Sequence, residues 1–145
     1  MNRIIFMLLG GMLLSNCVDK QKNDSYTRVV FDPGALKFFA SSVNKKQETM
    51  AALYGNDKAY QTLSKGDSIS AAGTILRLVT WRYHDNPQYT GGTINGELLS
   101  VESVYVNEAG KASYELEASA LQSETNEVAD KQERIKYIMS YKPVF

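Results

Sequence analysis

Apolar and polar residues alternate through the middle of the chain, and this pattern predicts a series of β-strands. Residues 74–84 form a long run rich in β-branched and aromatic side chains. Asp85-Asn86-Pro87 breaks this run, Asn95-Gly96 is a strong two-residue hairpin signal, and residues 107–111 read as a turn. Because the links between strands are short, the pattern predicts an antiparallel meander. The strands expected from it are 74–84, 88–94, 98–106 and 113–120.

Strict alternation within residues 74–84 separates two sets of side chains. Val79, Trp81 and Tyr83 share one face of this strand, whereas Thr80 and Arg82 share the other. Antiparallel sheets commonly pack one face against a core and leave the other in water. We therefore expect the aromatic set to face the helices and the polar set to face solvent.

The segment before the strands carries a helix-start signal. Asp32 is a suitable cap, and Pro33 suits the first helical position. Leu36, Phe39 and Ala40 would then share one face of a short helix. The segment that follows, 47–54, fits a strand or a helix equally well.

Two further helices are expected, one on either side of the strand-rich region. Asn56 or Asp57 can cap a helix that runs to residue 65, and Gly66 is placed to end it in a left-handed conformation. Residues 127–140 show helical spacing of apolar residues. The predicted fold class is α+β, an antiparallel β-meander of about four to five strands packed with two to three helices. The apolar stripe of the helix that ends at residue 65 is expected to contain Ala59, Tyr60 and Leu63.

The start of the chain has a different pattern. Arg3 precedes residues 4–14, an apolar run without a charged residue. A transmembrane helix needs about 20 apolar residues, so this run is too short to span a bilayer but suits a secretory signal peptide. The order Leu14-Ser15-Asn16-Cys17 resembles the end of a bacterial lipoprotein signal, in which the cysteine becomes the lipidated first residue. Asn16 departs from the Gly, Ala or Ser that is usual there, and a membrane-anchored segment with an incidental cysteine is the alternative.

This resemblance implies a division of the chain and a location. We expect a signal peptide at 1–16, a lipidated Cys17 with a flexible polar tether at 17–30, and a single globular domain at 31–145. Several acyl chains, such as palmitate, on one residue would give stable membrane anchoring. Val18 rather than aspartate follows the cysteine, so the common inner-membrane retention signal is absent. The expected location is the outer membrane of a cell envelope, on its periplasmic side or surface-exposed.

Composition narrows the function classes. Lys plus Arg and Asp plus Glu both number 16, so the net charge is zero and no nucleic-acid partner is expected. The single cysteine excludes an intrachain disulfide and a zinc site built from several cysteines. If lipidation consumes Cys17, no thiol remains for nucleophilic catalysis. No metal site and no catalytic residue is predicted.

His84 is the sole imidazole of the chain and the first candidate for chemistry. It could ligate haem iron or act as a general base, but a histidine at the end of a strand without a ligand cluster is more often only exposed. Arg82 shares a face with Thr80 and His84, and this trio could hold an anion. The polar outer face of a sheet explains the same pattern and is the favoured interpretation.

Aromatic residues in the meander are the second candidate. Trp81 and Tyr83, with Tyr89 and Tyr105 nearby in the meander, could line a pocket for a planar ligand. The favoured alternative is that these side chains simply form the core.

Several segments of the chain resemble a known family of exported proteins. The match covers residues 48–57, 72–81, 100–104 and 134–139, with Tyr-Gly-Asn-Asp at 54–57 and Val-Thr-Trp at 79–81 as its most specific pieces. These segments are similar to small proteins grouped with the cytochrome P-460 family, whose best-known members are periplasmic c-type haem proteins with an antiparallel sheet and helices. The resemblance implies that fold and an exported location. Covalent haem attachment does not carry over, because the chain has no Cys-x-x-Cys-His motif and has Pro87-Gln88-Tyr89 where related sequences often have Pro-His-Trp.

Three functions remain open from the sequence. The favoured one is a non-catalytic binding or accessory lipoprotein without a cofactor, attached to the membrane through Cys17 and bound to a protein partner or a small ligand. The second is an oxidoreductase or electron carrier that holds haem non-covalently through His84. The third is a structural protein of the envelope.

Lipidation of Cys17 is directly testable. Labelled fatty acid should enter the wild-type protein in bacterial cells and should be absent from Cys17→Ser, because the thioether needs the sulfur. Gel fluorography of both proteins measures this. Equal labelling of the two would contradict the lipoprotein interpretation.

Overall fold

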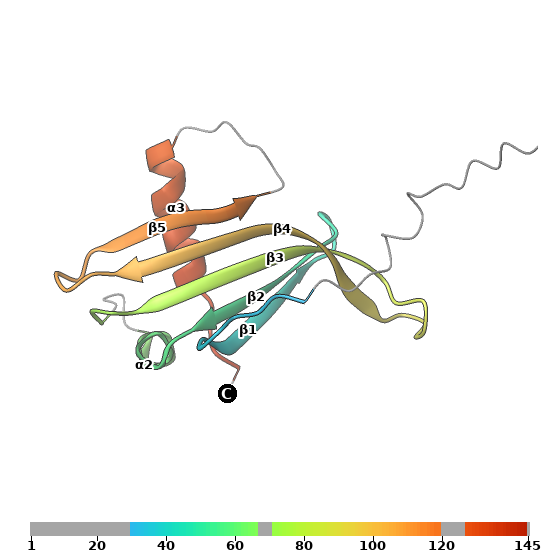
Figure 1. Ribbon diagram of the computed structural model, residues 1–145, viewed down its shortest axis with the longest axis horizontal. Coiled ribbons are helices and arrows are strands. Elements are labelled where there is room, and N and C mark those ends of the chain that lie inside the picture. Colours follow the sequence, from blue (N-terminus) through green and yellow to red (C-terminus); the bar gives the residue numbers. More distant parts are fainter. Residues whose placement is uncertain (1–29, 67–70, 120–126, 145) are drawn as a thin grey trace, which may run out of the picture.

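A computed structural model describes residues 30–66, 71–119 and 127–144 (Figure 1). The expected signal peptide, Cys17 and most of the tether lie outside these residues. Five strands form one antiparallel sheet in the order β1-β2-β3-β4-β5, and two helices accompany it in the described part of the chain. The coarse prediction of an α+β fold with an antiparallel meander is therefore confirmed, although the sheet dominates more than expected. The elements are β1 (Lys37–Asn44), β2 (Thr49–Gly55), α2 (Asp57–Lys65), β3 (Ile75–Asp85), β4 (Thr93–Val106), β5 (Ala112–Ser119) and α3 (Glu127–Met139).

The prediction of a short helix after Asp32 is wrong. Asp32 accepts a hydrogen bond from the backbone N–H of Gly34 at 2.9 Å, which closes a turn, and β1 begins three residues later. A register shift between Phe38 and Ala40 marks a bulge in β1, and both Phe39 and Ala40 are buried. Two adjacent buried residues break the strict alternation of a regular strand. The bulge therefore produced the spacing of Leu36, Phe39 and Ala40 that resembles one face of a helix.

Helix α2 follows the capping prediction closely. The side chain of Asn56 accepts a hydrogen bond from the N–H of Ala59 at 3.0 Å, and Gly66 ends the helix with φ 67°. Leu63 is buried as expected. Tyr60 is exposed, and Thr62 occupies the buried position instead.

The hairpin turn predicted at Asn95-Gly96 is also wrong, because both residues lie inside β4. Asn95 is opposite Tyr83, and pairing of β3 with β4 continues to Asp85 opposite Thr93, so the turn is formed by residues 86–92. A Cβ atom on Gly96 would lie 2.5 Å from Cδ2 of His84. Glycine is therefore needed here for the close approach of an imidazole ring rather than for a turn.

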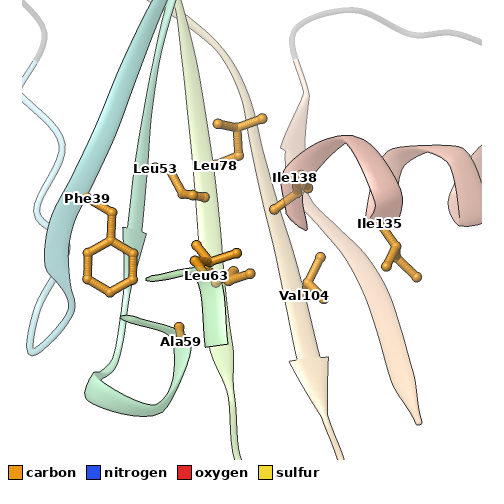
Figure 2. Packing of buried hydrophobic residues seen from close by; sticks show 9 residues of the cluster. Phe39, Leu53, Ala59, Leu63, Leu78, Val104, Ile135 and Ile138 are labelled. Carbon is orange, nitrogen blue, oxygen red and sulfur yellow. The ribbon is translucent and has the colours of Figure 1, made fainter. Parts of the chain in front are cut away.

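One face of the sheet carries the helices and the larger core (Figure 2). Both helices contribute to it, since side chains of α2 and α3 meet those of the strands. These buried residues are Phe39, Leu53, Ala59, Leu63, Leu76, Leu78, Val104, Ile135 and Ile138. The C-terminal segment closes the edge of the sheet, where the N–H of Val144 donates to the carbonyl oxygen of Phe39 at 3.0 Å.

The opposite face of the sheet carries a second apolar cluster, and this corrects the expected orientation of β3. Leu78 belongs to the helix-side core, so Val79 and Trp81 point away from the helices. Phe31 covers this cluster, with its ring centroid 6.5 Å from that of Trp81 in an edge-on arrangement. Tyr83 is half-buried and belongs to neither cluster. The alternation was correct, but both faces of β3 are apolar, so the pattern alone did not fix which one meets the helices.

Trp81 should be essential for stability although neither α2 nor α3 covers it. Its side chain is only 5% exposed, so Trp81→Ala should lower the free energy of unfolding by about 3–5 kcal/mol. Leu116→Ala is the matched control, because Leu116 is 49% exposed and should cost less than about 1 kcal/mol. Urea denaturation measures both. Equal losses would mean that the second cluster does not stabilise the fold.

Candidate functional site

A polar pocket of about 120 Å³ lies on the helix side of the sheet, between α3 and the β1–β2 hairpin. Leu78 belongs both to its wall and to the helix-side core, so the pocket continues the core outward. Most of its other walls are uncharged polar side chains. It is lined by Ser42, Asn44, Gln47, Thr49, Ala51, Leu78, Thr80, Arg134 and Tyr137.

Arg134 is the charged group of the pocket, and a buried carboxylate holds it in place. Its Nε donates to Oε1 of Glu102 at 2.8 Å, and one terminal nitrogen donates to Oε2 at 2.6 Å. The side chain of Glu102 is 6% exposed and that of Arg134 is 35% exposed. This two-point pair fixes the plane of the guanidinium. The hydrogen bond to Glu102 raises the pKa of Arg134, and burial opposes that rise.

Two tyrosines complete the surroundings of this ion pair. The hydroxyl of Tyr114 donates to Oε1 of Glu102 at 2.8 Å, so the carboxylate accepts three hydrogen bonds. The guanidinium carbon of Arg134 lies 4.7 Å from the ring centroid of Tyr137, in a cation–π contact. Arg134 is therefore held along one edge and over one face.

A chain of hydroxyl groups links α3 to the first strand. The hydroxyls of Tyr137 and Tyr141 are 3.0 Å apart, and that of Tyr141 lies 2.7 Å from Oγ of Ser42. Burial raises the pKa of Tyr141 to about 12. The hydroxyl of Tyr141 thus stays protonated at physiological pH and can bridge the two elements.

The β1–β2 hairpin forms the outer wall of the pocket. Oδ1 of Asn44 accepts hydrogen bonds from the backbone N–H of Lys46 at 3.1 Å and of Gln47 at 3.2 Å. Nδ2 of Asn44 donates to Oε1 of Gln47 at 3.0 Å. These local bonds fix the turn, so the pocket wall does not depend on a ligand for its shape.

The structure does not bring the predicted anion-binding trio together in this pocket. Only Thr80 lines it, and Thr80 faces the helix side rather than open solvent as expected. Arg82 lies 3.6 Å from the carboxylate of Glu97, with 41% of its side chain exposed. His84 packs against Gly96, and the edge of its ring that carries Nε2 faces the backbone there.

The aromatic candidates also lie outside the pocket. Trp81 is part of the second cluster, in agreement with its alternative assignment to the core. Its Nε1 is the one buried side-chain polar atom without a hydrogen-bond partner in the described part of the chain. Tyr89 is 69% exposed in the turn after β3, and Tyr105 takes part in a polar cluster with Glu117.

That polar cluster fastens three neighbouring strands on the face opposite the helices. Arg77 of β3 donates to Glu117 of β5 at 2.7 Å and to Oγ of Ser103 of β4 at 3.1 Å. The hydroxyl of Ser103 also donates to Glu117. Burial alone would raise the pKa of Glu117, but its bonds to Ser103 and Arg77 bring it below the ordinary value. Ser103 is fully buried, so the cluster acts as a structural tie.

Sequence reasoning missed Arg134, Tyr137 and Glu102. A signal was available in the expected strand 98–106, where Glu102 stands between Val101 and the run Ser103-Val104. A carboxylate at such a position needs a cation close by. Arg134 is the cation, but its distance of 32 residues in the sequence hid the pairing.

Comparison with known proteins adds no family to this description. No protein-family model matches the chain, and no curated protein matches it significantly. Neither helix in the described residues is long and apolar enough to cross a membrane. The same residues contain no group of three or more His, Cys, Asp or Glu side chains that could hold a metal ion.

The ion pair makes a testable contribution to stability. Arg134→Met should cost about 3 kcal/mol, because it leaves the buried carboxylate of Glu102 without its cation. The double variant Arg134→Met/Glu102→Leu should recover most of this loss, since it removes both charges. Arg82→Met, at an exposed pair, is the control and should cost less than about 1 kcal/mol. Chemical denaturation measures these variants and Glu102→Leu alone, and a double variant whose loss equals the sum of the two single losses would contradict the coupling.

Proposed function

We propose that the protein is an exported bacterial lipoprotein, anchored to the outer membrane through Cys17, whose domain binds a small polar molecule in the pocket beside Arg134. The signal-like order of the first 17 residues supports the anchor. From the resemblance to the cytochrome P-460 family, the proposal takes only the fold and the exported location. Haem chemistry is not part of it.

Unused hydrogen-bonding groups in the pocket are the observation that carries the binding proposal. Arg134 has five N–H donors, of which two reach Glu102, and the other three meet no acceptor among the described residues. The hydroxyls of Thr49 and Thr80 form no side-chain hydrogen bond within the same part of the chain. Polar groups gathered around a hollow in this way suit a ligand that supplies their partners.

The size of the pocket limits its ligand. An engineered cavity of about 150 Å³ holds a benzene molecule, whereas this pocket measures about 120 Å³. The volume suits a molecule of about six heavy atoms or fewer, by comparison with that cavity. A larger ligand would have to extend into solvent.

The arrangement of charges favours binding over acid–base catalysis. Glu102 is the buried carboxylate of the described residues, and its three hydrogen bonds are made to Arg134 and Tyr114. These bonds occupy three of its about four lone-pair positions and commit it to holding Arg134, so it is poorly placed to take a proton from a ligand.

A pocket-filling substitution tests the binding function. Thermal-shift measurements with a panel of small uncharged and charged polar molecules should identify a ligand of the full chain. Ala51→Leu adds three carbon atoms to the pocket wall and should abolish the shift. Ala71→Leu, at an exposed position outside the pocket, should leave it unchanged. A panel in which no molecule binds, or binding that survives Ala51→Leu, would contradict the proposal.

The haem alternative has its own readout. Added haem should give no stoichiometric Soret band with the purified protein, because ligation through Nε2 of His84 would require its ring to turn away from Gly96. A stoichiometric band that disappears in His84→Ala would move the protein to the haem class. His84→Ala itself should leave the free energy of unfolding within about 1 kcal/mol of the wild-type value.

A further inference from the structure

We infer that the ligand of the Arg134 pocket is a small uncharged molecule of the amide class, with a carbonyl oxygen directed at Arg134. This inference rests on the proposed binding function and specifies the ligand. It follows from three features of the pocket: the free edge of the guanidinium, the net charge of the walls, and the mixture of hydroxyl and apolar groups.

The free edge of Arg134 calls for an acceptor atom. Glu102 occupies the edge formed by Nε and one terminal nitrogen, which leaves the N–H groups of the opposite edge for another partner. Tyr137 covers one face of the group, so a ligand approaches in the plane of the guanidinium or from the other face. A carbonyl oxygen has two lone pairs and can accept from this edge.

The charges around the pocket favour an amide ligand over a carboxylate ligand. The positive charge of Arg134 is already balanced by Glu102, and the other eight lining residues are uncharged at neutral pH. A carboxylate ligand would bring a second negative charge close to Glu102 with no further cation in the lining. An amide has nearly the same shape and adds no charge, so the pocket should prefer it.

The remaining walls complement the rest of an amide. The oxygens of Thr49 and Thr80 can accept hydrogen bonds from an amide NH₂ group, because no side-chain hydrogen bond within the described residues occupies them. Ala51 and Leu78 supply apolar surface for a short alkyl group. Acetamide has four heavy atoms and combines these groups within the available volume.

Acetamide and acetate are matched probes, since they differ in charge and NH₂ group but hardly in shape. Each is titrated into the isotope-labelled full chain in detergent, and backbone amide shifts are followed by two-dimensional NMR. Acetamide should shift signals of pocket residues with a Kd at least about fivefold lower than that of acetate. Thr80→Val should weaken acetamide binding about fivefold, the equivalent of one net hydrogen bond, and the exposed Thr93→Val should not.

The outcomes separate this inference from the function on which it rests. Tighter binding of acetate, or equal binding of the two probes, overturns the amide class but leaves a binding pocket. Acetamide shifts that survive Thr80→Val overturn the assigned contacts. Binding only by panel molecules that lack an amide also overturns the inference, while a pocket that binds nothing overturns the proposed function as well.

Discussion

Burial of the Glu102 carboxylate is the constraint on which the packing of α3 against β4 and β5 depends. A carboxylate that is 6% exposed needs a cation and further donors, because its hydration is lost in the interior. Arg134 of α3 and Tyr114 of β5 supply them, so this charge positions α3 on the sheet together with the core contacts of Ile135 and Ile138. The same requirement places Arg134 beside the β1–β2 hairpin. The pocket beside Arg134 therefore exists because the buried carboxylate of Glu102 needs a cation from α3.

The two apolar faces of β3 explain how a thin domain of one sheet and two described helices is stabilised. Leu76 and Leu78 pack under the helices, while Val79 and Trp81 pack on the other side. Neither helix of the described residues covers this second cluster, and Phe31 from the segment before β1 contacts Trp81 instead. The N-terminal segment thus substitutes for a third layer, which lets a small chain bury both faces of its central strand.

Sequence signals correctly predicted those parts of the fold that depend on residues close together in the chain. The cap at Asn56, the left-handed Gly66 and the long strand at β3 each depend on neighbouring residues, and each was predictable. Phe39 and Asn95-Gly96 were misread because a bulge and a close ring contact come from partner strands, which the sequence does not display. The pocket was least predictable, since it joins Ser42 with Arg134 across most of the domain.

The hydrogen bond between Val144 and Phe39 affects the order in which the chain can complete its fold. It joins the first strand to the end of the described chain, across 144 − 39 = 105 positions. Closing so long a loop carries an entropic cost that local turns avoid, and contacts of high sequence separation slow folding. Until residues 141–144 reach the sheet, β1 lacks this backbone partner and the hydroxyl bond of Ser42 to Tyr141. The β1 edge of the sheet is therefore completed by the contact that spans the greatest distance along the described chain.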